Sequence, residues 1–270
     1  MSPGVPLPPD PAEPAATGGP ALSAVVITHD EERDVGRCLE SLRGVADEVV
    51  VVDSGSADRT EEICRAHGAR FTRQEWLGYA EQKNLADGLA RHDWILSLDA
   101  DEALSEELRR SILALKARGA IRVGRFARLT NYCGHWVRHG GWYPDYKVRM
   151  FDRRRVRWAG GPHERLEGFA RDEVVTLRGD CLHYSYYTVA EHHRQADHFT
   201  TLSAEELFRR GRRAGFLRRH LSPAWKFVVG YVLRLGFLDG AAGFRIAAIS
   251  AGATRMKYTK LARLARGETA

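Results

Sequence analysis

Cysteine is scarce in this sequence of 270 residues, and the four that occur lie far apart. Cys38, Cys64, Cys133 and Cys181 include no C-x-x-C pair. A disulfide framework depends on several closely spaced cysteines, so this spacing favours reduced thiols and a cytoplasmic protein.

Long hydrophobic runs are also lacking. The most apolar region, residues 225–251, is interrupted by four charged residues, Lys226, Arg234, Asp239 and Arg245. A membrane-spanning helix needs roughly 20 consecutive, mainly apolar residues. We therefore expect no transmembrane helix.

Proline is rare after the first 21 residues, which hold seven of the ten prolines. This low-complexity lead, residues 1–21, has too little apolar side-chain surface to fold, so we expect it to be disordered. It also lacks a basic segment followed by an apolar one, which is the pattern of a secretory signal peptide. The sequence therefore predicts a folded region that starts near residue 22.

Acidic residues are nearly absent from the last quarter of the chain. Residues 207–270 contain fourteen Lys or Arg but only Asp239 and Glu268, a local net charge of +12, whereas the whole chain carries +6. Residues 1–206 are therefore mildly acidic, at −6. A basic tail of this kind indicates an anionic partner, such as a membrane surface or a nucleic acid.

A short apolar run that ends in carboxylates is the most informative feature that the sequence does contain. Residues 94–98 are too few for a helix and predict a strand buried on both faces, and Asp99, Asp101 and Glu102 follow it. Ligands of open parallel sheets bind at the carboxyl ends of the strands, and oxygen ligands there suit Mg²⁺ or Mn²⁺. The alternative is that Asp101 caps a following helix.

Neighbouring segments place this strand in an α/β fold. Strands and helices are predicted to alternate, with strands at residues 24–27, 48–53 and 69–72 and helices at 35–42 and 79–91. The alternation predicts a mostly parallel central sheet flanked by helices. Asp30, Asp53 and Asp99 would then lie at the same carboxyl edge of the sheet.

Seven short motifs follow one another along the chain. They are Ile27-Thr28-His29-Asp30-Glu31-Glu32, Val52-Asp53-Ser54-Gly55-Ser56-Ala57-Asp58-Arg59-Thr60, Gln82-Lys83-Asn84, Leu98-Asp99-Ala100-Asp101-Glu102, Pro162-His163-Glu164-Arg165-Leu166, His183-Tyr184-Ser185-Tyr186 and Gly236-Phe237-Leu238-Asp239-Gly240. Together they resemble family 2 glycosyltransferases of the GT-A fold, especially the bacterial enzymes of lipopolysaccharide core assembly. The resemblance implies a Rossmann-like GT-A catalytic domain over residues 22–200 and a basic amphipathic helical tail over residues 201–270.

The resemblance also implies which residues bind the metal and the donor. Asp101 of the D-x-D motif and His183 would hold a divalent metal, Mg²⁺ or Mn²⁺, beside the diphosphate of a nucleotide sugar, expected to be a UDP-sugar. The nucleotide donor would contact Thr28, Glu31, Asp53, Lys83, Asp99 and Gly141. Two of these residues have a structural alternative: Asp53 would cap the turn after its strand, and Lys83 would be a solvated helix lysine.

Glu164 is the candidate general base. In the resembled family an acidic residue in this region accepts the proton of the acceptor hydroxyl. With one base and no covalent nucleophile, the reaction would invert the configuration at the anomeric carbon. The alternative for Glu164 is a salt bridge to Arg165 or Arg149.

The basic tail suits an enzyme whose acceptor is a lipid-linked saccharide, such as the lipopolysaccharide core, with glucose as the expected sugar. An apolar and aromatic stripe would lie on anionic lipid, ringed by Lys226, Arg234 and the arginines of residues 209–219; its members are Trp225, Phe227, Val228, Tyr231, Leu235 and Leu238. We therefore expect peripheral association with the inner face of the cytoplasmic membrane. Alternatively, the tail packs on the catalytic domain.

Three other functions remain as alternatives. The acceptor could belong to another cell-envelope glycan or be polyprenyl-linked. A nucleotidyltransferase would need a glycine-rich, basic loop after the first strand, where this chain has His29-Asp30-Glu31-Glu32. A nucleic-acid-binding module would use the basic tail, but no such fold signature is present and the body is acidic, so we expect no nucleic-acid partner.

Overall fold

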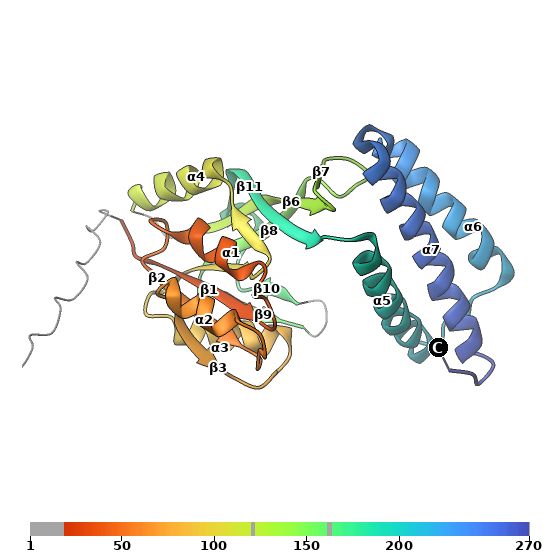
Figure 1. The fold of residues 1–270 in the computed structure, drawn as a ribbon, viewed down its shortest axis with the longest axis horizontal. Coiled ribbons are helices and arrows are strands. Elements are labelled where there is room, and N and C mark those ends of the chain that lie inside the picture. The colour runs from red at the N-terminus through yellow and green to blue at the C-terminus, as the bar shows by residue number, and fades with distance from the viewer. Residues whose placement is uncertain (1–18, 120–121, 161–163, 270) are drawn as a thin grey trace, which may run out of the picture.

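The computed structural model describes residues 19–119, 122–160 and 164–269. A nine-stranded sheet with helices on both faces forms an α/β body, residues 22–186, and a unit of helices follows it (Figure 1). The strands of the sheet are β1 Leu22–Thr28, β2 Glu48–Asp53, β3 Arg70–Arg73, β4 Trp94–Asp99, β5 Glu102–Leu104, β6 Val123–Tyr132, β7 His135–Val137, β8 Asp145–Asp152 and β11 Val174–Tyr186. The other elements of the body are α1 Val35–Leu42, α2 Thr60–Ala66, α3 Tyr79–Leu89, α4 Glu106–Ala117, the short 3₁₀ helix η1 Arg171–Glu173, and the paired strands β9 Arg157–Ala159 and β10 Arg165–Glu167.

One half of the sheet is parallel and has the strand order β3-β2-β1-β4. β1 pairs in parallel with β2 and β4, and β2 pairs in parallel with β3. Helices cross between these strands and cover both faces of the sheet, so the strands are near-continuous apolar runs. The strands and helices that the sequence predicts in this region are all present, with ends shifted by a few residues at most.

The other half of the sheet is mixed. β8 runs antiparallel to both β4 and β6, β11 runs parallel to β6, and β5 runs antiparallel to β11. The expectation of a mostly parallel sheet therefore holds for the first half only. β6, β7 and β8 follow one another without an intervening helix, and such short connections favour antiparallel pairing.

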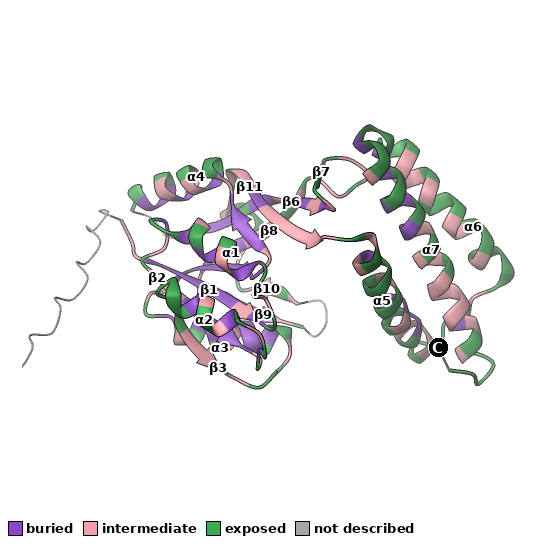
Figure 2. Cartoon of the chain, in the orientation of Figure 1, coloured by how far each residue is buried: buried purple, intermediate pink, exposed green. Residues whose placement is uncertain are grey.

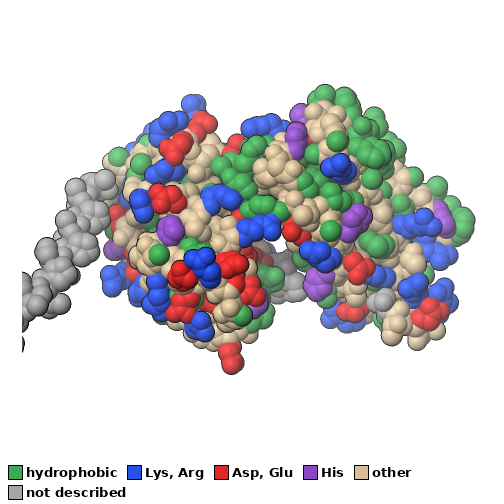
Figure 3. All heavy atoms as spheres, in the orientation of Figure 1, with side chains coloured by type: hydrophobic (Ala, Val, Ile, Leu, Met, Phe, Trp, Pro, Cys, Tyr) green, Lys and Arg blue, Asp and Glu red, His purple; other side chains and the backbone are tan. Residues whose placement is uncertain are grey.

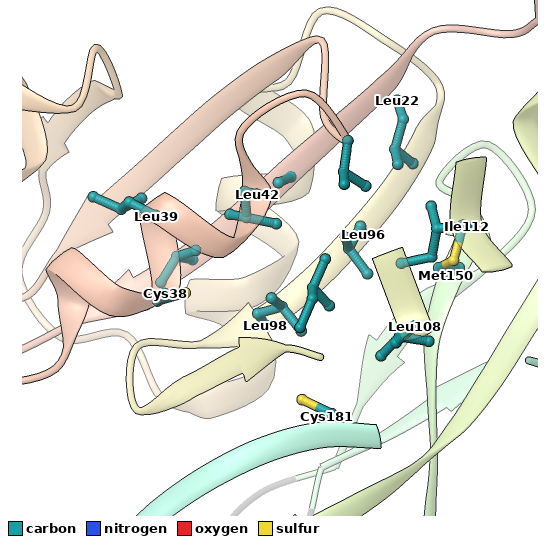
Figure 4. Packing of buried hydrophobic residues seen from close by; sticks show 14 of the residues in the cluster. Leu22, Cys38, Leu39, Leu42, Leu96, Leu98, Leu108, Ile112, Met150 and Cys181 are labelled. Carbon is teal, nitrogen blue, oxygen red and sulfur yellow. The ribbon is translucent and has the colours of Figure 1, made fainter. Parts of the chain in front are cut away.

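Two apolar layers pack on the two faces of the sheet. Along β4, Trp94 and Leu96 enter the layer covered by α1 and α4, whereas Ile95 enters the layer covered by α3. Figure 4 shows Leu42 of α1, Leu96 of β4 and Leu108 of α4 facing the same interior. The alternation follows from the two-residue period of a strand, which sends successive side chains to opposite faces.

The cysteines are free thiols, as the sequence predicts. Cys38, Cys64 and Cys181 are buried in the first apolar layer. Burial raises the pKa of the Cys38 and Cys181 thiols well above the usual value, with nearby carboxylates such as Glu102 adding to the shift. These cysteines therefore behave as small apolar core residues.

A helical unit, residues 189–264, follows β11 and lies beside the body at the right of Figure 1. Its elements are α5 Val189–Arg209, α6 Phe216–Phe227, the π-helical turn η2 Val228–Leu233, the 3₁₀ turn η3 Gly236–Asp239 and α7 Gly240–Leu264. The domain boundary placed at residue 200 falls inside α5. Most of the predicted lead, residues 1–18, lies outside the described residues.

The helical unit is much less buried than the body. None of the residues of α6 is buried, and Figure 2 shows α5, α6 and α7 with long exposed stretches. Among the described helices, none is by itself both long and apolar enough to cross a membrane. The segments Phe216–Leu233 and Gly236–Leu264 meet that test of length and composition only when taken together, and they are bent by 74° at their junction.

Candidate active site

The carboxyl ends of β1, β2 and β4 lie side by side, as the sequence predicts. In the register of the sheet, Thr28 is opposite Asp53 and Ile27 is opposite Asp99. β5 then places Glu102 opposite His183 of β11, which brings a residue far along the chain to the same edge.

A cavity of about 710 Å³ opens at this edge. Its lining includes five residues that the sequence analysis assigned to the donor or the metal: Thr28, Glu31, Asp99, Asp101 and His183. A volume of this size is within the usual range for small-molecule and cofactor sites. The cavity at the edge with the acidic cluster is larger than four others in the described residues, which measure about 120–420 Å³.

The cavity wall carries the carboxyl groups of Glu31, Asp99 and Asp101. Burial, together with the charges of Asp101, Asp34, Asp58 and Asp99, raises the pKa of Glu31 to about 8. The hydroxyl of Thr28 is buried on the cavity wall and has no hydrogen-bond partner among the described residues. The site thus presents a field that attracts cations and a polar group with free hydrogen-bonding capacity.

Asp101 and His183 face each other across the cavity wall. Nε2 of His183 lies 3.1 Å from Oδ2 of Asp101, and Nδ1 of His183 lies 3.3 Å from the hydroxyl of Thr130. The pairing of β5 with β11 holds the two backbones together, since Tyr184 N donates to the carbonyl of Asp101 at 2.9 Å. The two predicted metal ligands are therefore neighbours in space, although 82 positions separate them in the sequence.

The two candidate metal ligands, Asp101 and His183, fit a divalent cation that keeps open coordination positions. In residues 19–119, 122–160 and 164–269, no group of three or more His, Cys, Asp or Glu side chains is arranged to hold a metal ion. Mg²⁺ is commonly bound by only one or two carboxylates, with water and substrate phosphate oxygens completing the shell. One carboxylate, one imidazole and a negative cavity match that pattern, and a closed structural site would not.

Asp99 is held in a buried ion-pair network. Its Oδ2 accepts from Nη2 of Arg149 at 2.5 Å, and its Oδ1 lies 2.9 Å from Nζ of Lys83. Burial alone would raise the pKa of Asp99, but the charges and hydrogen bonds of Arg149 and Lys83 lower it far below its usual range. Arg149 also pairs with Glu102 at 3.0 Å. Because its pKa is lowered, Asp99 is ionised, and both of its oxygens already contact Arg149 or Lys83.

Lys83 links Asp99 to the candidate base. Its Nζ lies 3.0 Å from Oε1 of Glu164 and 4.6 Å from the centre of the Trp158 ring, and its side chain is nearly fully buried. The alternative of a solvated lysine is therefore wrong. Glu164 does form a salt bridge, but with Lys83 and not with Arg165 or Arg149. Arg165 instead pairs with Glu167.

Three predicted donor contacts do not line the cavity: Lys83, which pairs with Asp99 and Glu164, and also Asp53 and Gly141. The carboxylate of Asp53 is fully buried and accepts hydrogen bonds from Gly55 N and from both N and Oγ of Ser56. It thus caps the turn after β2, which was the structural alternative. Gly141 lies on two other cavities, beside the helical unit and beside His183.

Sequence reasoning missed several residues of the site. Arg149 is almost fully buried and joins Asp99 to Glu102, but in the sequence it is one charged residue among many. Glu102 was recognised as part of the acidic cluster, but not as a buried ion-pair partner. Trp76 and Tyr79 also line the cavity, and their rings pack edge to face with centres 4.8 Å apart. The position of Arg149 between the apolar residues Val148 and Met150 of β8 was a signal that could have indicated the network.

A comparison with family models decides the assignment. Residues 23–169, more than half of the chain, match the model of glycosyl transferase family 2. The chain belongs to this family. As a family 2 glycosyltransferase it is an enzyme of glycosyl transfer, and the α/β GT-A fold that the sequence predicts is confirmed.

Relatives of this family 2 glycosyltransferase carry similar names. The lipopolysaccharide core biosynthesis glycosyltransferase LpsC of Rhizobium meliloti is 31% identical, and the match covers 81% of this chain and 82% of LpsC. An uncharacterized glycosyltransferase of Rickettsia typhi is 27% identical over 90% of this chain and 87% of its own length. Both matches extend well beyond residue 169, so the helical unit is part of the likeness.

Solved structures show a more distant likeness. Glucosyl-3-phosphoglycerate synthase of Mycobacterium tuberculosis, in complex with Mn²⁺, UDP and glucosyl-3-phosphoglycerate, is 22% identical, with a TM-score of 0.36 over 43% of this chain and 46% of that one. A mycobacterial protein has a TM-score of 0.46 and 17% identity over 70% of this chain and 76% of its own.

Proposed function

We propose that this family 2 glycosyltransferase transfers a sugar, with inversion and with a divalent metal, from a UDP-sugar to a lipid-linked saccharide. Glucose is the proposed sugar and the lipopolysaccharide core the proposed acceptor. The Asp101–His183 pair on the wall of the 710 Å³ cavity carries the donor and metal part of this proposal. The likeness to LpsC supports the acceptor class.

Asp101 and His183 would hold the cation, Mg²⁺ or Mn²⁺, against the donor diphosphate. Bound there, the cation would neutralise the charge that develops on the leaving diphosphate. Thr28 and Glu31 line the same wall and would contact the nucleotide, with Asp99 nearby. The exposed rings of Trp76 and Tyr79 also line the cavity, and the face of either ring would offer a stacking surface for a nucleobase.

Glu164 would accept the proton of the attacking acceptor hydroxyl. Its pairing with Lys83 fixes one carboxylate oxygen, Oε1, and its side chain remains one-fifth exposed. A single base and direct attack at the anomeric carbon convert an α-linked donor into a β-glycoside. Lys83 acts in this scheme as a positioning residue, because it holds Glu164 and Asp99 on either side of one ammonium group.

The helical unit would bring the enzyme to the acceptor at an anionic membrane surface on the cytoplasmic side. Hydrophobic side chains gather over this unit with Lys and Arg around them (Figure 3). On α6, four large apolar residues are 60–68% exposed: Phe216, Leu217, Leu221 and Trp225. Phe227 and Tyr231 of the predicted stripe instead pack on Phe244 of α7, so the stripe divides between packing and an outer surface.

The test of the donor site is a thermal-shift panel of nucleoside diphosphates and nucleotide sugars, with and without Mn²⁺ or Mg²⁺. UDP or a UDP-sugar should stabilise the wild type in a metal-dependent way, since a ligand raises apparent stability by mass action. Asp101→Asn should remove the metal-dependent part of the shift. Asp172→Asn makes the same change at an exposed residue of η1 and serves as the matched control.

The panel distinguishes the parts of the proposal. Selective stabilisation by another nucleotide would overturn the UDP assignment and leave the site in place. A shift that is equal with and without metal, or that is unchanged in Asp101→Asn, would overturn the metal role.

A further inference from the structure

A smaller cavity lies where the helical unit meets the body. It measures about 130 Å³ and lies between the loop after β7 and the segments α6, η2 and α7. Its lining includes His139, Gly141, Trp142, Lys226, Arg234 and Asp239. Its volume is far below that of the donor cavity, so it suits a small group rather than a nucleotide.

The wall of this cavity carries two cationic side chains, Lys226 and Arg234, against one carboxylate. Asp239 is the acidic residue on its wall, and it is committed to the loop: it accepts from His139 N at 2.8 Å and from Arg138 N at 3.2 Å. Among the ion pairs of residues 19–119, 122–160 and 164–269, none involves Lys226 or Arg234. Two cations against one carboxylate that is already hydrogen-bonded leave an excess of positive charge on this small cavity, which favours an anionic ligand.

Arg234 is fixed in this position from both ends. Its carbonyl accepts from Gly140 N at 2.8 Å, and its side chain lies across Gly141. Gly141 has a φ of +83°, and a Cβ there would lie only 2.4 Å from Nη1 of Arg234. The guanidinium can occupy this place because residue 141 has no side chain.

The cavity is connected to the active site through shared residues. Gly141 and Trp142 also line a neighbouring cavity of about 310 Å³, and that cavity shares His183 with the donor cavity. On the outer side, Leu233 and Leu235 flank Arg234 and are exposed. The small cavity is therefore between an apolar outer surface and the metal-binding edge of the sheet.

We propose that this cavity binds a phosphate group, with Lys226 and Arg234 as its charge partners. Arginine offers a planar pair of donors that fits phosphate oxygens, and lysine adds a compact charge. The inference rests on the proposed function in one respect, namely that the acceptor is a lipid-linked saccharide. If the bound phosphate belongs to that acceptor, its saccharide would extend into the 310 Å³ cavity. The phosphate belongs either to that acceptor or to a headgroup of the surrounding bilayer.

The first experiment titrates inorganic phosphate into the full chain by calorimetry, without divalent metal so that phosphate is not held at Asp101 and His183. The double variant Lys226→Gln/Arg234→Gln should bind phosphate at least tenfold more weakly than the wild type. Neither side chain forms a hydrogen bond among the described residues, so folding should persist. The matched control Arg212→Gln/Arg218→Gln removes the same charge from exposed positions and should bind like the wild type.

Vesicle sedimentation identifies the source of the phosphate, with phosphatidylglycerol compared against phosphatidylcholine. A bilayer headgroup as the source predicts that the cavity variant loses more phosphatidylglycerol binding than the control, and that free phosphate competes in the wild type. A phosphate carried by the acceptor predicts equal vesicle binding by the two double variants. Both outcomes require the loss of phosphate binding in the cavity variant.

Equal phosphate affinity in all three proteins would overturn the proposal. Lys226→Gln alone is the second variant if the double variant fails to fold, and it should weaken phosphate binding severalfold; wild-type affinity in that variant would overturn the proposal as well. The calorimetric titration measures phosphate binding in the absence of a nucleotide-sugar donor and does not depend on enzymatic activity. A failure of the UDP panel therefore leaves this result standing, and the reverse also holds.

Discussion

The α/β body and the helical unit differ most in where their large side chains lie. In the body, Trp94, Phe126 and Phe151 are completely buried between sheet and helices. In the helical unit, Trp225 and Phe216 are 62% and 68% exposed. The body therefore owes its fold to its own core, whereas the helical unit leaves large apolar side chains exposed among the described residues.

Polar and aromatic contacts hold the helical unit together in place of a large core. Nζ of Lys260 in α7 lies 2.7 Å from Oδ1 of Asp197 and 2.6 Å from the hydroxyl of Thr201, which joins α7 to α5. Phe244 of α7 packs on the rings of Phe227 and Tyr231. These contacts orient three helices while leaving the outer face of α6 free.

The strongest way to test this comparison is to remove a large side chain from the core of the body. Trp94→Ala should lower the free energy of unfolding by about 3–5 kcal/mol, because it leaves a cavity under β4 that the packed layers cannot fill. Urea unfolding followed by circular dichroism measures the change. A loss below about 1 kcal/mol would contradict the view that the core of the body determines its stability.

The contrast between the two regions also explains what the sequence could predict. The strands β1, β2 and β4 are apolar runs that end in polar residues, and their local pattern alone indicates their structure and their common edge. The mixed half was less predictable, since the neighbours of β8 and β6 are set by short connections and not by a residue pattern. The predicted boundary at residue 200 lies within α5, which runs from Val189 to Arg209.

The residues of the candidate site could be predicted where they belong to a recognisable motif, but not where their role depends on burial by segments distant in the sequence. Asp101 and His183 were found from motif resemblance, and the β5–β11 pairing brings them together. The environment of Lys83 could not be predicted, because its exposure depends on β9 and Trp158, which are distant in sequence. Gly141 shows the same limit, since its partner Arg234 comes from the helical unit.

The junction between the two regions gives a smaller effect. Asp239 of η3 is buried and holds the loop after β7 through His139, Arg138 and His135. Asp239→Asn should destabilise the protein by about 1–3 kcal/mol at pH 7, because one of the two acceptor oxygens becomes an NH2 donor and leaves at least one buried donor without an acceptor. Limited proteolysis of the loop together with thermal unfolding measures the loss.

The pH dependence separates a role for the charge of Asp239 from a role for its shape. Burial opposes ionisation of Asp239, but hydrogen bonds from Arg138 and His139 outweigh it and lower the pKa below its usual value. A carboxyl with a lowered pKa stabilises the fold above its unfolded pKa, about 3.9, and loses that effect as the pH falls further. The difference between wild type and Asp239→Asn should therefore shrink below about pH 4; a constant difference would assign the effect to packing.

The smallest effect on stability is expected on the outer face of the helical unit. Trp225→Ala should change the free energy of unfolding by less than about 0.5 kcal/mol, because this side chain packs on little of the protein. Its partition onto phosphatidylglycerol vesicles should nevertheless fall about five- to thirtyfold, since a buried aromatic side chain contributes about 1–2 kcal/mol. Trp76→Ala removes a tryptophan that is 48% exposed beside the donor cavity and should keep vesicle binding. Unchanged vesicle binding of Trp225→Ala, or an equal fall in both variants, would assign the exposed surface of α6 to a role other than membrane contact.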